Sequence, residues 1–201
     1  MKMGKEMESN KINRMINELS QDMFVPYEQL PPYDLFLSQV TDFLNDNFKN
    51  EHYTNNIIQN YIKSEVISKP EAGKKRGYTK LHLVQLVILS YMRPVLTMDQ
   101  IKKVFRLAFN DINDRSDDII NWEQAYECFC EIQKEAFDSF AYSELFNESN
   151  INSIIGKLNL KKEDEHRITL FIMVIILVSQ SSVIKNLVKR IIDASDNSEN
   201  E

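Results

Sequence analysis

Residues 54–92 read TNNIIQNYIKSEVISKPEAGKKRGYTKLHLVQLVILSYM, and this stretch decides the fold that the sequence predicts. Thr54, at its start, is a residue type favoured just before the first turn of a helix. Over residues 55–65, isoleucine and tyrosine recur every three or four positions, which places them on one side of a helix. We therefore expect a helix with one buried face and one polar face.

The polar face of this predicted helix carries four amides and one lysine, and we call it the amide face: Asn55, Asn56, Gln59, Asn60 and Lys63. Asn and Gln can contact both major-groove groups of adenine in a bidentate manner. Any solvated helix face is polar, however, so this pattern alone leaves base recognition and simple solvation both open.

Residues 68–79, which we call the basic loop, hold one proline and two glycines around the cluster Lys74, Lys75 and Arg76. This composition predicts a β-hairpin or an exposed loop. Its cations, together with Lys63, suit phosphate contacts, which fix register without specifying sequence. Tyr78 either donates its hydroxyl to a phosphate or packs beneath the loop, and the sequence leaves both interpretations open.

Two further helices are expected after the basic loop. Residues 81–91 are apolar nearly all round, and Pro94 then forces a break. Thr97 and Gln100 have capping-box spacing at the start of the next helix. That helix carries a second basic patch, which either flanks DNA or solubilises the helix: Lys102, Lys103 and Arg106.

In its order of elements, the chain resembles the N-terminal winged helix-turn-helix domain of MerR-type regulators over about 60 residues. The wing signature of that family is similar to Arg76, Gly77, Tyr78, Thr79 and Leu83, and its Ser or Thr followed by an Ile-Lys pair is similar to Thr97, Ile101 and Lys102. Asn56 and Gln59 stand where the family usually carries arginines, which points to an uncharacterised bacterial branch. The resemblance implies binding to double-stranded DNA as a transcriptional regulator, with no operator or effector identified.

Charge is distributed unevenly along the chain. The 201 residues carry a net charge of −6, but residues 51–110 hold ten basic and four acidic side chains, a local charge of +6, so the rest carries −12. Phosphate binding depends on such local charge. The hydrophobic content of 43% and only four glycines favour a folded, mainly α protein.

Four segments are expected from these patterns. Residues 1–31 form an arm and linker, and residues 32–110 form the DNA-binding domain, whose first helix begins at Pro32. Residues 111–194 form a helical region for dimerisation or regulation, and residues 195–201 form a disordered tail. The helical region contains a heptad-like stripe: Ile119, Trp122, Tyr126, Phe129, Gln133, Ala136 and Phe140.

The longest apolar run, residues 168–178, has 11 residues and is short of the roughly 17 to 25 that cross a bilayer. We expect it to be a buried core or interface helix that, with the 119–140 stripe, caps the domain or joins two protomers. A homodimer and no membrane are the resulting expectations. A peripheral membrane protein using residues 168–190 is one alternative, and a protein-interaction module using residues 55–63 is another.

Cys128 and Cys130 point roughly 200° apart around a helix, which suits neither a disulfide nor a shared metal. With no signal peptide at the start, a reducing cytoplasm is expected. The sequence contains no phosphate-cradling glycine loop, nucleophile elbow or metal-ligand cluster. We therefore expect no enzymatic activity, no cofactor and no metal.

Overall fold

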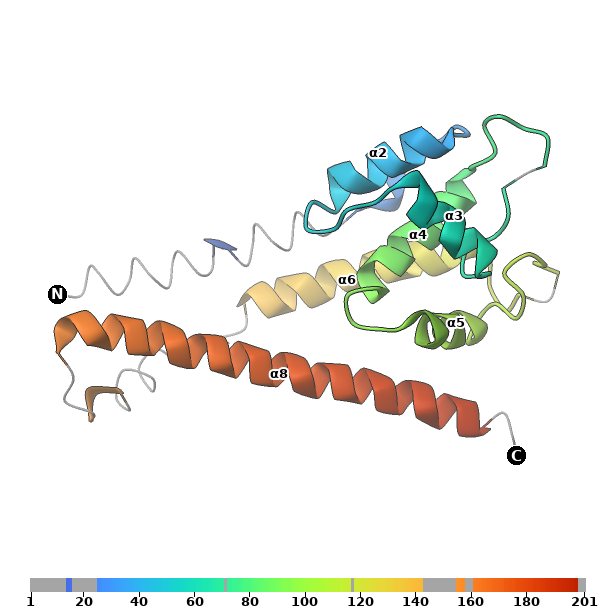
Figure 1. Ribbon diagram of the computed structural model, residues 1–201. Coiled ribbons are helices and arrows are strands. Elements are labelled where there is room, and N and C mark those ends of the chain that lie inside the picture. Colours follow the sequence, from blue (N-terminus) through green and yellow to red (C-terminus); the bar gives the residue numbers. More distant parts are fainter. Residues whose placement is uncertain are drawn as a thin grey trace. The chain divides into compact units, whose positions relative to one another are not determined.

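The computed structural model describes residues 14–15, 25–70, 72–116, 118–142, 155–157 and 161–198. The chain divides into two compact units, Met1–Ala141 and Tyr142–Glu201. Helices dominate the described residues, where β pairing is limited to two isolated bridges (Figure 1). The prediction of a mainly α protein is confirmed.

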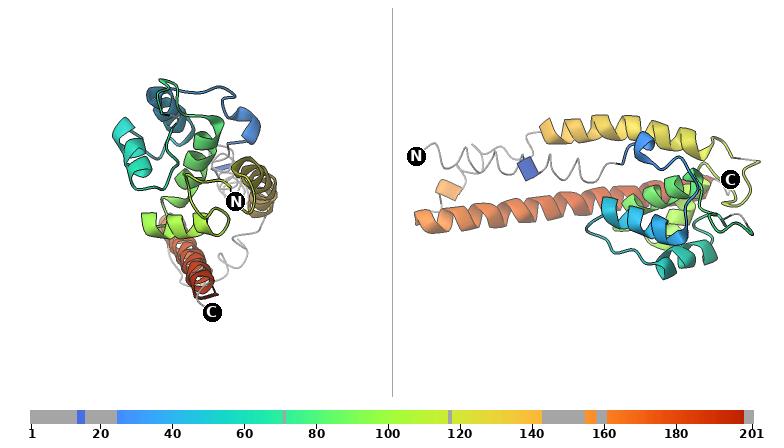
Figure 2. Two further views of the ribbon diagram at one scale, coloured as in Figure 1. Left: turned by 90° about the vertical axis from the view of Figure 1, so that its right-hand side faces the viewer. Right: turned by 90° about the horizontal axis from the view of Figure 1, so that it is seen from above.

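The first unit consists of helices packed around α4. In chain order they are η1 (Tyr27–Gln29), α2 (Leu37–Asn47), α3 (Asn55–Lys63), α4 (Lys80–Met92), α5 (Met98–Arg106) and α6 (Trp122–Tyr142). Both views in Figure 2 place α3 and α6 on opposite sides of α4. The face of α3 that points away from α4 is therefore on the far side of the unit from α6.

Helix α4 is buried on nearly every side, as its all-round apolar sequence predicts. Leu83, Val84, Leu86, Val87 and Leu89 are all fully buried. The helix ends at Met92, just before Pro94, and α5 begins after Thr97, whose hydroxyl accepts the Gln100 backbone N–H at 3.3 Å. The predicted break and capping box are both confirmed.

Both ends of α3 have recognisable local signals. The Thr54 hydroxyl accepts the Ile57 backbone N–H at 3.3 Å, as predicted. At the other end, the Val66 N–H donates to the Tyr61 carbonyl at 2.9 Å and the Glu65 N–H donates to Ile62 at 3.0 Å. These two bonds form a Schellman motif, which places Glu65 in the left-handed region at a φ of 54°. Glycine is the residue that this position favours.

The first helix of the domain was expected to start at Pro32, and that expectation is wrong. Helix α2 begins five residues later, at Leu37. Leu35 is instead extended and pairs with Tyr78, with N···O distances of 2.8 and 3.3 Å. Gln39 then closes the first turn by accepting the Phe36 N–H at 3.0 Å. The bridge to a residue far along the chain holds this segment out of the helix.

The proline-rich end of the expected arm and linker is packed into the unit. Val25 and Leu30 are each only 1% exposed. The Val25 N–H donates to the Tyr91 hydroxyl of α4 at 3.1 Å, and the Val25 carbonyl accepts from the Tyr126 hydroxyl of α6 at 2.5 Å. Val25 and Leu30 are therefore part of the core and anchor residues 25–31 to the unit. The rest of the expected arm, apart from residues 14–15, lies outside the described residues.

Helix α6 also belongs to the first unit, so the predicted boundary at residue 110 does not coincide with the observed division. The Trp122 ring stacks on Phe109 with centroids 3.6 Å apart and meets Phe105 edge-on at 5.0 Å. Ile119, the first member of the predicted stripe, precedes the helix and is 75% exposed. The side chain of Phe140, the last member, lies outside the described part.

The second unit contains α8 (Lys162–Ser198), a single helix of 37 residues. It extends four residues into the segment expected to be a disordered tail, and residues 199–201 lie outside the described part. The 168–178 run was expected to be covered, but six of its large apolar side chains are exposed, from Leu177 at 39% to Val178 at 61%, and the others are half-buried. By length and composition, Arg167–Ser195 is long and apolar enough to cross a membrane.

The left-handed conformation of Glu65 gives the first prediction. Glu65→Gly should raise the free energy of unfolding by about 0.5–1 kcal/mol, because glycine has no β-carbon to oppose a positive φ. Urea unfolding measures the change. Glu65→Ala is the matched control, since it removes the carboxylate but keeps the β-carbon. An equal gain in both variants would show that charge, and not backbone strain, is responsible.

Candidate nucleic-acid interface

The amide face of α3 is open to solvent. Asn55, Asn56, Gln59, Asn60 and Lys63 are all exposed, whereas Ile58 and Tyr61 on the opposite side are buried. Because successive members lie one or three positions apart, they share one side of the helix. The structure thus brings the five predicted residues of α3 onto a single surface.

Helix α2 holds the start of α3 in place. Asn45 makes two hydrogen bonds with the Tyr53 backbone: its amide donates to the carbonyl at 3.0 Å, and its oxygen accepts the N–H at 2.8 Å. The Thr41 hydroxyl donates to the Asn55 side-chain oxygen at 2.7 Å. One acceptor of Asn55 is therefore used within the protein, which makes Asn55 partly a positioning residue.

The residues before α3 are also attached to α4. The Tyr53 hydroxyl donates to the Ser90 hydroxyl at 2.8 Å, and Ser90 in turn donates to the Leu86 carbonyl at 2.7 Å. The Arg93 guanidinium lies 5.5 Å from the centre of the Tyr53 ring and 3.4 Å from the Glu51 carboxylate. Together with the α2 contacts, these bonds fix α3 against the core.

The beginning of the basic loop is held by a buried amide. Gln85 of α4 is fully buried, and its side-chain oxygen accepts both the backbone N–H and the hydroxyl of Ser68, at 3.0 and 2.8 Å. The Lys69 N–H donates to the Asn113 side-chain oxygen at 2.9 Å. The sequence contains no local signal for either contact, since the partners lie 17 and 44 positions apart.

The end of the basic loop is held by Tyr78. Its backbone forms the bridge to Leu35, and its side chain is only 7% exposed, with the ring edge-on to His82 at 5.6 Å. Burial raises the pKa of Tyr78 above its ordinary value. Of the two interpretations left open by the sequence, the structure places the ring beneath the loop.

Between these anchors, the described residues 72–76 are exposed and irregular, so the segment is a loop and not a hairpin. Gly73 takes a positive φ of 82°, which turns the chain just before the three cations. Lys74, Lys75 and Arg76 are exposed, and the Arg76 guanidinium lies 4.9 Å from the centre of the Phe36 ring. The loop thus presents its cations from two fixed ends.

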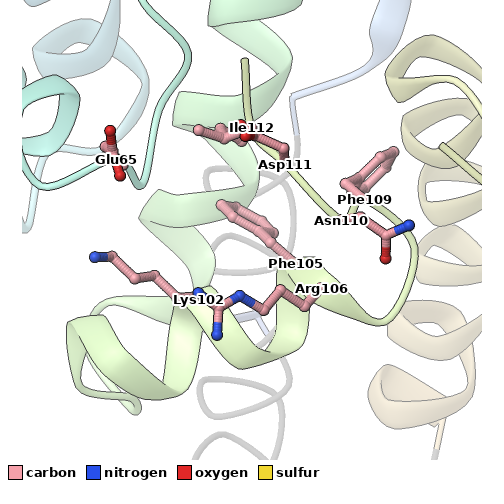
Figure 3. Close-up of a pocket in the computed structure, with 8 residues that line it drawn as sticks. All are labelled: Glu65, Lys102, Phe105, Arg106, Phe109, Asn110, Asp111 and Ile112. Carbon is pink, nitrogen blue, oxygen red and sulfur yellow. The ribbon is translucent and has the colours of Figure 1, made fainter. Parts of the chain in front are cut away.

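The second basic patch borders an open pocket between α5 and the turn after α3. Figure 3 shows Lys102 and Arg106 extending from α5, with Glu65 across from them. Phe105 and Phe109 supply its apolar lining. Across the residues that the structure describes, no three His, Cys, Asp or Glu side chains cluster in a way that could hold a metal ion.

Residues 25–129 match the family described as a domain of unknown function, DUF1836. The chain belongs to the DUF1836 family. The matched region runs from the anchored Val25 into α6 and therefore contains α3, the basic loop and the α4 core. Helix α8 lies outside the DUF1836 region.

One curated relative is the uncharacterized protein YkrK of Bacillus subtilis (strain 168). It is 37% identical over 73 residues, which cover 35% of this chain and 30% of the relative. The chain thus matches less than a third of the length of that protein. No solved structure matches the chain.

The buried tyrosines behind the interface give a pH prediction. Burial raises the pKa of Tyr61 to about 12, against the opposing charge of Arg93. The folded-state pKa of Tyr61 lies above the unfolded value of about 10. The protonated Tyr61 phenol therefore makes its full contribution to stability below pH 10, and this contribution is lost as the pH rises toward 12. Tyr91, whose pKa is also raised to about 12 by burial, adds to the same loss.

Urea unfolding at pH 8, 10 and 11.5 should therefore show stability falling only above about pH 10. Tyr61→Phe has no phenol to ionise and should lose about 2 kcal/mol less than the native protein over that range. An equally steep loss in Tyr61→Phe would show that the Tyr61 hydroxyl does not titrate from a buried position.

Proposed function

We propose that the chain binds double-stranded DNA as a bacterial transcriptional regulator, with α3 in the major groove and the basic loop on the adjacent backbone. The observation that carries this proposal is that the same unit presents an exposed amide face on α3 and an exposed cationic loop that is fixed at both ends. Amides can read base edges, and lysine or arginine can neutralise phosphates. In this proposal the fold is a MerR-like winged helix-turn-helix in which the basic loop serves as the wing.

Charge and geometry both support the proposal. Residues 55–79, which contain α3 and the basic loop, hold five basic and two acidic side chains, a net +3 of the +6 carried by residues 51–110. Helix α6 covers α4 from the side opposite α3, so it leaves the amide face open (Figure 2). The order of α3, basic loop, α4 and capped α5 is also similar to the order of elements in the MerR-type domain.

Changing the loop cations tests the phosphate contact. The triple variant Lys74→Ala, Lys75→Ala, Arg76→Ala should weaken binding to any duplex and reduce the slope of log affinity against log salt by up to about 3, since each phosphate contact contributes about 0.9. Gel retardation of duplex DNA at several salt concentrations measures both quantities. The matched control is Lys102→Ala, Lys103→Ala, Arg106→Ala, which removes the same charge from α5.

An equal effect of the two triple variants would mean that binding follows net charge and not the loop. Failure of the native protein to retard duplex DNA at low salt, or to enrich any sequence from random duplexes, would reject the proposal. Salt-insensitive binding of a protein partner through residues 55–63 would then favour an interaction module.

The amide face is tested separately from the loop. Gln59→Ala should lower affinity for a selected sequence by about 1–3 kcal/mol, because a bidentate contact to one base pair is lost. Affinity for unrelated duplexes should not change. Selection from random DNA with the variant should relax the preference at one position. An equal loss of affinity for all sequences would show that Gln59 contacts the DNA backbone instead of a base.

A further inference from the structure

Helix α8 carries a long apolar surface. Residues 168–184 contain 17 consecutive positions without a charged side chain, within the single helix Lys162–Ser198. Their large apolar side chains are largely exposed, with Phe171, Val174 and Val183 each more than half exposed. A surface of this size on a protein marks a contact with lipid or with another protein.

The distribution of apolar residues around α8 discriminates between these two partners. A second copy packed as a coiled coil would cover one seam, and Leu170, Leu177 and Ile184 have the heptad spacing for it. Phe171, Ile175 and Val178 lie off that seam and are 47–61% exposed. A coiled-coil partner leaves these side chains in water, whereas lipid surrounds every face of the helix.

Two hydroxyls within the apolar part of α8 are satisfied by the helix itself. The Thr169 hydroxyl donates to the Glu165 carbonyl at 2.8 Å, and the Ser181 hydroxyl donates to the Leu177 carbonyl at 2.9 Å. Internal bonding of this kind is what a hydrocarbon environment requires.

The length of the uncharged stretch and the charges at its two ends also fit a lipid bilayer. Seventeen residues of helix span roughly 26 Å, close to the roughly 30 Å of a bilayer core. Arg167 and Lys185 flank the stretch, where their long side chains can reach the headgroups.

We propose that α8 inserts into a lipid bilayer and tethers the first unit to the membrane. The partner is the hydrocarbon core of the bilayer, and the contact does not depend on DNA binding by the first unit. Because apolar residues lie on all sides, insertion is expected and not adsorption of one amphipathic face.

The test uses the full chain made in bacteria and fractionated into membrane and soluble material. The native protein should sediment with membranes, resist extraction by alkaline carbonate, and float with vesicles of phosphatidylethanolamine and phosphatidylglycerol. Release by carbonate would reject insertion, and recovery as a soluble dimer would assign the surface to a second copy.

Two matched substitutions sharpen the result. Ile175→Lys lies off the heptad seam and Leu177→Lys lies on it. A lysine near the middle of an inserted helix lowers insertion by about 100-fold, so both variants should lose carbonate resistance. If only Leu177→Lys has an effect, and it converts a dimer to a monomer, the bilayer proposal is wrong. Circular dichroism and DNA retardation report separately whether the first unit still folds.

Discussion

The first unit depends on one constraint, which is that nearly every side of α4 must be covered. An apolar helix of this kind is stable only when neighbours cover its whole circumference, and each fully buried Leu or Val on it contributes about 1.5–3 kcal/mol. A single helical pair cannot provide that cover. This requirement explains why α6 and residues 25–31 pack onto the unit, although their sequences suggest a separate helical region and a linker.

Three polar side chains of α4 connect it to the start of the basic loop, to the residue before α3 and to the N-terminal segment. Gln85 accepts two hydrogen bonds from Ser68 at the start of the basic loop, Ser90 accepts from Tyr53 just before α3, and Tyr91 accepts from Val25. Buried polar groups need partners, so each contact is satisfied only in one arrangement of the chain. The core helix therefore sets the positions of α3 and the loop as well as the stability of the unit.

The sequence predicts those features of the fold that depend on residues close together in the chain. Thr54, Thr97 and Pro94 act within one helical turn, and the helix ends that they mark are where the sequence places them. The amide face is likewise exposed as expected. The start of α2 was missed because Leu35 pairs with Tyr78, 43 positions away. The contact of Val25 with α4 and α6 lies outside any periodic pattern for the same reason. The exposure of side chains in residues 168–178 was missed because an apolar run does not by itself say what covers it.

The two anchors of the basic loop have a consequence for association with any partner. A free segment of this length would lose much of its conformational freedom on docking, at about 1–2 kcal/mol for each residue that becomes fixed. Here the two ends, Ser68 and Tyr78, are already immobilised by the fold, so part of that entropy is lost during folding and not at encounter. Affinity then reflects the contacts themselves, and the lifetime of a complex should respond to individual side chains more than to the ordering of the backbone.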